Sequence, residues 1–348
     1  MADQALYRVE VGGLDISVKI FPILQRLSVT DQAGTTSDSA EIELDDLGGH
    51  IAFPAEKADV TISLGWKYRG IGEVFRGTVS DVRSAGDRGG GLRMVISAKG
   101  ADTKSKVKQS TEKHWDKKPL SAVFQEAAQL AGLTAIVDPT LGKIERPYWA
   151  MSAESFLHFG HRLSEEIGGT FKVVGKTAII AARNGGISAS GATLPTVIGR
   201  HGGNLIDWDI SPIVGRPRYN RMSVRWYDTK EAKWKIEKVE VNDMDAEAEQ
   251  TMRWTRANKD EAKGHADSAA KESERNKGGG SVTINGDIDA QPEGMFALIG
   301  ARPGVDGVYK IDKVQHSLTR SEGFTTSLDL KNPAGEAGKD KRGEGSAE

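Results

Sequence analysis

The stretch 306-DGVYKIDKVQHSLTRSEGFTTSLDLK-331 decides the fold of this chain. Its second run, from Phe324 to Leu330, alternates between the two faces of a strand, with the apolar residues on one parity. A polar segment at 319–323 contains a glycine and follows another strand-like run. The stretch therefore predicts a β-hairpin.

The first run changes parity part-way along. Tyr309 and Ile311 share one parity, whereas Val314 and Leu318 share the other. This change around Asp312-Lys313 predicts a β-bulge, which bends strands in barrels.

His316 lies on the parity of Val314 and Leu318, so it faces a core or an interface. A catalytic base also requires a nucleophile and an orienting group. We therefore interpret His316 as a structural residue.

Similar strand patterns fill both ends of the chain. Gly-, Asp- and Ser-rich segments such as 84–91 separate them, which is typical of a barrel or sandwich. The other alternating runs are 7–11, 16–20, 40–44, 60–66, 222–227, 234–239, 281–284 and 295–299.

The middle of the chain has a different texture, with helical spacing of apolar residues. We expect a helix from Leu120 that ends at Gly132, a strand at 133–137, a helix capped by Ser152 that ends at Gly168-Gly169, and a hairpin of strands 170–174 and 177–182.

These patterns predict a mainly β fold with an α/β insert, in which two similar β-barrel domains flank a small helix–strand–helix–hairpin domain. We expect the first β-barrel domain at 1–112, the α/β insert domain at 113–184, the second β-barrel domain at 185–331 and a flexible tail at 332–348. Residues 184–203 are weakly patterned.

A further helix is expected at about 259–276 within the second β block. Asn258 and Glu261 resemble a capping box at its start. Because its apolar face consists only of alanines, we expect this helix on the surface or docked against a partner.

The composition excludes several function classes. The 348 residues carry a net charge of −2, which argues against tight phosphate binding by the whole chain. The chain has no cysteine, so disulfides and thiolate chemistry are absent. No run approaches the roughly 20 apolar residues of a membrane helix, and the first residues do not resemble a signal peptide.

His158 and His161 are the best metal candidates, because residues three apart share a helix face. The zincin pattern is absent, and neither Glu165 nor Glu166 is fixed as a third ligand. The segment 70–77 contains three glycines but reads as a hairpin, since it lies between β runs.

Paired carboxylates occur as Asp45-Asp46 and as Asp207 with Asp209, in turn-like or surface contexts. We therefore predict no catalytic, cofactor-binding or metal-binding residue, no cofactor, and no enzymatic activity.

The basic stretch Lys99–Lys118 has two interpretations. Its seven lysines with His114 and Trp115 would suit a nucleic-acid-binding strip, on which the aromatic ring stacks with bases. The interpretation that we favour is a solvated connector between two domains.

Four stretches together resemble one family, the late-control protein D type of phage tail baseplate hub, over about residues 5–331. The front end of valine–glycine repeat spike proteins of type VI secretion is similar. The four stretches are 60-VTISLGW-66 with 74-VFRGTV-79, 117-KKPL-120 with the helix that follows, 149-WAMSAESFL-157 through 168-GGTF-171, and the opening stretch.

The resemblance implies a structural protein of a contractile phage tail. Three copies would form a pseudo-sixfold ring, a homotrimer, that joins the tail tube or tube-initiator protein to the central spike protein. Baseplate wedge proteins would contact it, and the tape-measure protein and DNA would pass through its lumen. Such a hub resides in the virion tail baseplate and is assembled in the bacterial host cytoplasm. Because only 18 residues follow Leu330, we expect the spike on a separate chain.

Two alternatives stay open at this point. One is a tail-associated cell-wall-degrading enzyme that uses residues such as Glu154, Glu165, His158 and His161. The other is a nucleic-acid-binding module that uses Lys99–Lys118.

Overall fold

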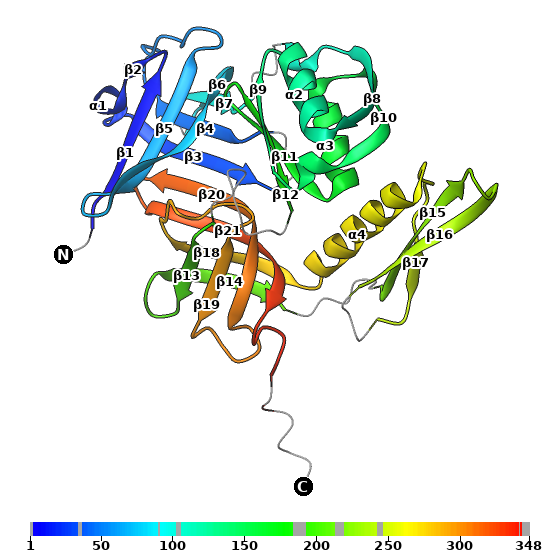
Figure 1. Ribbon diagram of the computed structural model, residues 1–348. Helices are drawn as coiled ribbons and strands as arrows, with labels where there is room; N and C mark the ends of the chain where they lie inside the picture. Colours follow the sequence, from blue (N-terminus) through cyan, green and yellow to red (C-terminus); the bar gives the residue numbers. More distant parts are fainter. Residues whose placement is uncertain are drawn as a thin grey trace.

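The computed structural model describes residues 3–33, 37–89, 91–101, 106–183, 193–212, 219–241, 246–340 and 342. Most of these residues lie in β-strands, which confirms the prediction of a mainly β chain. The strands and helices fall into four groups in space (Figure 1).

The first β region contains α1 (Ser17–Ile20) and seven strands. They are β1 (Ala5–Val11), β2 (Leu14–Asp15), β3 (Leu24–Gln32), β4 (Ser39–Asp45), β5 (Asp59–Trp66), β6 (Gly70–Asp87) and β7 (Gly91–Lys99).

The insert follows, with two helices and five strands. Its elements are η1 (Lys106–Lys108), β8 (Thr111–Pro119), α2 (Leu120–Leu130), β9 (Thr134–Val137), η2 (Leu141–Lys143), β10 (Glu145–Glu154), α3 (Phe156–Ile167), β11 (Gly169–Val174) and β12 (Thr177–Ala182).

The rest of the chain builds the second β region and a lobe that projects from it (Figure 1). The second β region contains β13 (Thr196–Arg200), β14 (Leu205–Ser211), β18 (Gly279–Asn285), β19 (Met295–Ile299), β20 (Gly307–Thr319) and β21 (Gly323–Ala334). The lobe contains β15 (Arg221–Asp228), β16 (Lys233–Glu240), β17 (Glu249–Thr251) and α4 (Lys259–Arg275).

Strand β20 joins the two β regions into one hydrogen-bonded sheet. Its first part pairs antiparallel with β19, from Gly307 to Lys310. Its second part pairs antiparallel with β3, from Lys313 to Thr319. The described strands of both regions therefore share one path, which runs β14-β18-β21-β20-β3-β4-β7-β6-β5-β1-β2.

The predicted hairpin and its bulge are both confirmed. Strands β20 and β21 pair antiparallel, and the register shifts between Ile311 and Lys313, so that Asp312 has no partner on β21. The bulge lies where β20 changes its neighbour from β19 to β3. The local bend therefore allows one strand to serve both β regions.

Each β region encloses a core of its own. Leu27, Ile62 and Leu64 belong to the first core, which also takes Leu318 and Phe324 from the hairpin. Tyr309, Ile311 and Leu330, from the other end of the same hairpin, belong to the second core, in which Phe296 is fully buried. The hairpin therefore contributes to two cores.

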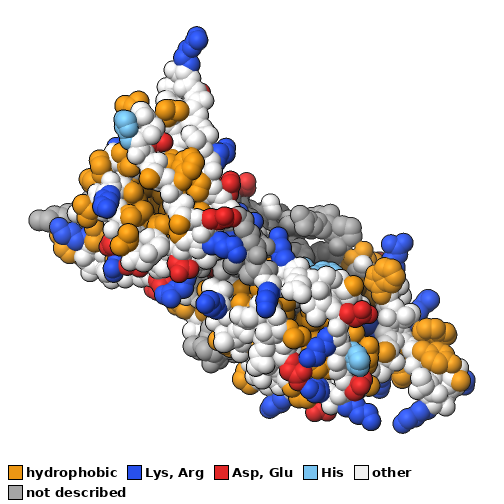
Figure 2. All heavy atoms as spheres, turned by 90° about the horizontal axis from the view of Figure 1, so that it is seen from above, with side chains coloured by type: hydrophobic (Ala, Val, Ile, Leu, Met, Phe, Trp, Pro, Cys, Tyr) orange, Lys and Arg blue, Asp and Glu red, His pale blue; other side chains and the backbone are white. Residues whose placement is uncertain are grey.

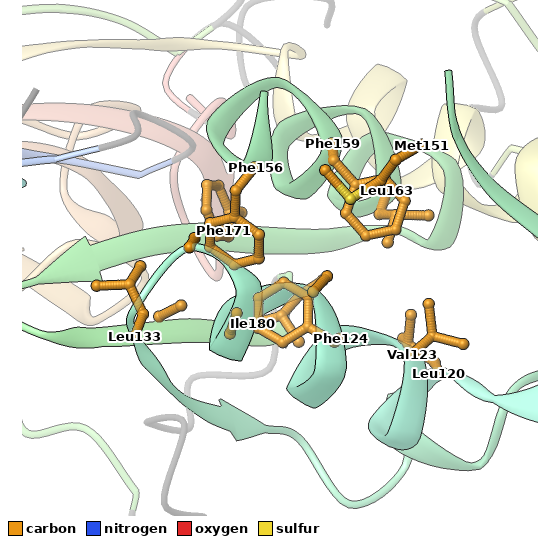
Figure 3. Packing of buried hydrophobic residues seen from close by; sticks show 14 of the residues in the cluster. Leu120, Val123, Phe124, Leu133, Met151, Phe156, Phe159, Leu163, Phe171 and Ile180 are labelled. Carbon is orange, nitrogen blue, oxygen red and sulfur yellow. The ribbon is translucent and has the colours of Figure 1, made fainter. Parts of the chain in front are cut away.

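The insert has a third core between its helices and the sheet β11-β12-β9 (Figure 3). Phe156 and Phe171 meet edge to face, with ring centroids 5.7 Å apart, and both rings lie within 6 Å of Phe124. Such aromatic contacts add to the stabilisation that burial of the rings provides.

Helix α4, which we expected on the surface or docked against a partner, packs against the β15 strand of its own chain. Ala262 and Ala266 are fully buried against Val224 and Trp226 of β15. The Asn258 side chain accepts a hydrogen bond from the Glu261 backbone N–H at 2.9 Å, so the predicted cap is confirmed.

Several predicted elements differ in the structure. The run 16–20 is the short helix α1, not a strand, because the Asp15 carboxylate accepts hydrogen bonds from the Ser17 N–H and hydroxyl. Ser152 does not cap α3, since it lies in β10, and the cap is Ser155. The weakly patterned stretch includes β13 and precedes β14.

The folded part extends past residue 331, where we expected the tail to begin. Ala334 pairs with Val308, and the Gly338 N–H donates to the Gly304 carbonyl at 2.8 Å. Residues 341 and 343–348 of the expected tail lie outside the described residues.

Candidate assembly surfaces

A buried charge cluster lies where α4, β20 and β21 meet. Arg275, at the end of α4, donates to Glu293 and to Asp312, at 2.6 Å in each case. Lys310 lies 3.8 Å from Glu293, and Lys331 lies 3.2 Å from Asp312. The bulge places the Asp312 carboxylate in this cluster, so the point that joins the two β regions is also tied to α4.

The electrostatics of this cluster follow from burial and pairing. Burial lowers the pKa of Arg275, but Glu293 and Asp312 outweigh it and raise the pKa above its ordinary value. For Lys310, burial dominates and lowers the pKa, even though Glu293 opposes it. Arg275 is therefore a permanent cation between two carboxylates.

A second ionic contact holds the insert against the first β region. Lys172 of β11 lies 2.8 Å from Asp31 and 2.7 Å from Asp38. Burial and the neighbouring Asp31 raise the pKa of Asp38 to about 7, although Lys172 opposes them. The Gly175 N–H also donates to the Gly100 carbonyl at 2.9 Å.

A third ionic contact joins the insert to the lobe. Glu166 of α3 lies 2.7 Å from Arg146, 3.2 Å from Arg162 and 3.8 Å from Arg256, which precedes α4. Burial raises the pKa of Glu166, but the arginines outweigh it and hold the pKa below its ordinary value. These residues line a cavity of about 440 Å³ that also includes Glu154.

His158 and His161 do not form a metal site with other described residues. His158 lies 3.0 Å from Glu154, and His161 lies 3.5 Å from Glu165. The His158 imidazole is largely exposed on α3, and that of His161 is partly exposed. Within the described part of the chain, no group of three or more His, Asp or Glu residues could hold a metal ion.

His316 lies on β20, opposite Thr326 of β21 in the hairpin. Its imidazole is buried, and Nδ1 lies 2.9 Å from the Thr326 hydroxyl. Burial lowers the pKa of His316 to about 4, and Asp31 opposes this shift. The imidazole is therefore neutral at pH 7, as a structural residue in a core requires.

Residues 111–118 of the basic stretch Lys99–Lys118 form part of a sheet. In this part, the stretch is therefore neither an unpaired nucleic-acid-binding strip nor a solvated connector between domains. These residues belong to β8, which pairs with β10. Trp115 is buried and donates to Glu126 at 2.8 Å, and Lys113 and Lys118 form ion pairs with the same carboxylate. Residues 102–105 of this stretch lie outside the described residues.

The other candidates have structural positions. The segment 70–77 belongs to β6, which pairs antiparallel with β5, so the expected hairpin is confirmed. Asp45 and Asp46 accept backbone hydrogen bonds in the turn after β4. Asp207 and Asp209 are exposed on β14.

The lobe presents an aromatic surface, which sequence patterns did not single out. Tyr227 and Trp234 are paired across β15 and β16, with ring centroids 5.2 Å apart. Trp234 is 63% exposed and Ile236 is 48% exposed; Trp254, between β17 and α4 in sequence, is 72% exposed. Hydrophobic side chains are visible at this tip of the molecule (Figure 2). Exposed aromatic clusters of this kind are typical of protein interfaces.

Among the described residues, no helix has both the length and the apolar character that membrane spanning requires.

Comparison with known proteins identifies the family of this chain. The family model of the phage tail baseplate hub (GPD) matches residues 35–322. The chain belongs to this family. The matched range includes the whole insert, the lobe and strands β4 to β20, whereas β1 to β3 precede it and β21 follows it.

Two phage proteins are similar in sequence to this hub-family chain. The probable baseplate hub protein of Escherichia phage P2 is 32% identical over 231 residues, which are 65% of this chain and 57% of the P2 protein. The probable baseplate hub protein of Escherichia phage 186 is 26% identical over 93% of this chain and 92% of that protein.

Solved structures share the fold at lower identity. A 43 kDa tail protein of prophage MuSo2 from Shewanella oneidensis has a TM-score of 0.69 and 14% identity, over 94% of this chain and 98% of that one. An E. coli component of the type VI secretion system has a TM-score of 0.55 and 11% identity, over 95% and 78% of the two chains. The fold of this chain is therefore shared with a prophage tail protein and with a component of the type VI secretion system.

Proposed function

We propose that the chain is the structural hub of a contractile tail, in which three copies form a ring of six similar β regions. The hub joins the tail tube to the central spike, and wedge proteins contact it from outside. The tape-measure protein and DNA pass through its lumen. It works without enzymatic activity in the tail baseplate, after assembly in the host cytoplasm.

The observation that carries this proposal is the position of β20. Because β20 pairs with β19 on one side of the bulge and β3 on the other, each copy supplies two β regions as one sheet. Three such pairs around a threefold axis offer six β units to a sixfold tube, and three identical faces to a threefold spike. The net charge of −2 suits a lumen through which DNA moves without being held.

The two alternatives receive less support from the geometry. Of the two carboxylates that an enzyme at α3 would use, Glu154 pairs with Arg162 and His158, and the exposed Glu165 lies 3.5 Å from His161. A nucleic-acid strip at 99–118 would lose the larger of its two rings, because Trp115 is buried, while His114 is exposed and stacks on Tyr148. Lysis of purified sacculi by the pure protein, or DNA binding that falls steeply with salt, would favour these alternatives instead.

The proposal is tested by the mass of the complex with the spike protein of the same particle. We expect light scattering to show three copies of the hub chain in each complex. A stable complex of one hub chain with one spike chain would contradict the ring.

A further inference from the structure

The cavity of about 440 Å³ lies between the insert and the lobe. Its walls come from β10 and α3 of the insert, from the segment that leads into α4, and from the first turn of α4. Helices α3 and α4 lie close together (Figure 1), and the Ser268 hydroxyl of α4 donates to the Glu165 carbonyl of α3 at 3.0 Å. Besides His158, the charged or titratable residues of the wall are three arginines and three glutamates: Arg146, Arg162, Arg256, Glu154, Glu166 and Glu261.

The formal charges of these six residues balance, but the contacts distribute them unevenly. Arg162 donates to both carboxylate oxygens of Glu154, at 3.2 and 2.5 Å. Glu166 lies 2.7 Å from Arg146, 3.2 Å from Arg162 and 3.8 Å from Arg256. Three arginines therefore share two carboxylates.

The third carboxylate, Glu261, is engaged elsewhere. Its Oε1 accepts a hydrogen bond from the Asn258 side-chain amide at 2.8 Å, at the start of α4. Among the described residues, Glu261 forms no ion pair. It therefore lies in the wall of the cavity without neutralising an arginine directly.

Arg256 is the arginine of this cavity without a close acceptor. Its backbone N–H donates to the Arg225 carbonyl of β15 at 2.8 Å, which fixes its position in the lobe. Its side chain is only 21% exposed, and its guanidinium donates no hydrogen bond to any described residue. Nε of Arg256 and Nε of Arg146 are both buried without a hydrogen-bond partner. Because buried donors are stabilised by an acceptor, these two groups favour a ligand that supplies one.

The charges around His265 of α4 agree with this accounting. Its pKa is lowered to about 4, first by burial and then by Arg256 and Arg146, whereas Glu166 opposes the shift. At this position the two arginines outweigh the carboxylate that they share.

We propose that the cavity binds a small oxyanion, a phosphate or carboxylate group, which accepts hydrogen bonds from Arg256 and Arg146. Both guanidinium groups lie within reach of one ligand, since each is within 4 Å of the Glu166 carboxylate. The planar guanidinium matches the oxygens of phosphate and carboxylate groups. Trp149 holds Arg146 in place, with the guanidinium carbon 4.4 Å from the ring centroid. Because Arg146 belongs to the insert and Arg256 to the lobe, the bound oxyanion ties the two parts together.

Titration calorimetry of the full chain with inorganic phosphate, at pH 7 and low salt, tests the site. We expect one phosphate per chain with a Kd of about 1 mM or below. A second titration with acetate distinguishes the two sources of the oxyanion. Tighter binding of phosphate supports a phosphate ligand, and tighter binding of acetate supports a carboxylate ligand at the same arginines. Absence of binding by both probes would overturn the proposal.

Substitutions assign the binding to this cavity. We expect Arg256→Gln to weaken binding of the preferred probe about tenfold or more, because the charged donors are lost. Arg253→Gln, at an exposed position of the same segment, is the matched control and should bind like the natural chain. Equal binding by Arg256→Gln and the natural chain would overturn the proposal.

Glu261→Gln tests the site in the opposite direction. It removes an anion from the cavity wall and leaves every arginine contact in place, so it should bind the same probe about twofold more tightly. This variant keeps the test valid if Arg256→Gln does not fold. Unchanged or weaker binding by Glu261→Gln would overturn the proposal. None of these outcomes bears on the ring of the proposed function, which is tested by the mass of the complex.

Discussion

Arg275 is the residue at which the lobe and both β regions meet. It ends α4, it is 2% exposed, and its guanidinium bridges Glu293 and the bulge residue Asp312. A buried ion pair is not necessarily more stable than a hydrophobic contact, but loss of one partner leaves the other charge buried alone. The cluster therefore makes the junction sensitive to single substitutions.

We predict that Arg275→Met lowers the free energy of unfolding by about 3–5 kcal/mol, because it leaves Glu293 and Asp312 without their shared cation. Urea unfolding at pH 7 measures this loss. Arg302→Met is the matched control, since Arg302 is exposed and lies 3.3 Å from Asp340; it should cost less than about 1 kcal/mol. Equal losses in the two variants would contradict a special role for Arg275.

The environment of His316 could be predicted from the sequence, but that of Arg275 could not. His316 was expected to face a core or an interface because it alternates in step with Val314 and Leu318 along one strand, and this pattern lies within a few residues. The partners of Arg275 lie 18 and 37 residues away in sequence, and no local pattern brings them together. Burial of a charge cluster is a property of the tertiary fold alone.

Among the elements, α3 shows how a helix end is fixed. The Ser155 hydroxyl accepts a hydrogen bond from the His158 N–H at 3.3 Å, and Gly168 ends the helix in the left-handed conformation with φ 67°. The glycine end was predictable, since few other residues adopt that conformation. The start of α3 could not be predicted from the sequence, because serine is a good N-cap and both Ser152 and Ser155 were available. The pairing of β10 with β8 places Ser152 in a strand and leaves Ser155 as the cap.

We predict that Ser155→Ala destabilises the chain by about 1 kcal/mol, because one N–H of the first turn of α3 loses its acceptor. Ser152→Ala is the control and should change stability by less than about 0.5 kcal/mol. Denaturant unfolding followed by tryptophan fluorescence compares the two. If Ser152→Ala were the more harmful substitution, the assigned start of α3 would be wrong.

At the scale of the whole molecule, ionic contacts tie the parts together. They include Arg275 at the junction, Glu166 between insert and lobe, and Lys172 between insert and first β region. The mainly β class and the helix–hairpin character of the insert were predictable from periodicity. The pairing of β20 with β3 was not, because it joins residues near 30 to residues near 315.

The contact at Lys172 should make stability depend on pH. The pKa of Asp38 is raised to about 7 in the folded chain, above its ordinary value of 3.8, because burial and Asp31 disfavour its charge. The folded state therefore holds this proton more tightly than the unfolded state. The resulting stability is fully present below pH 3.8 and is lost as the pH rises through 7.

We predict that Asp38→Asn is more stable than the natural chain at pH 8, by about 1–3 kcal/mol, because the amide stays neutral beside Asp31. At pH 3 the two proteins should unfold at similar urea concentrations, since Asp38 is then protonated in both the folded and the unfolded state, and the difference should grow as the pH rises from 3.8 to 7. Asp59→Asn, at an exposed position of β5, is the control and should show no such pH dependence. A variant that is less stable than the natural chain at pH 8 would show instead that Lys172 requires both carboxylates, and that ionised Asp38 helps to hold the insert.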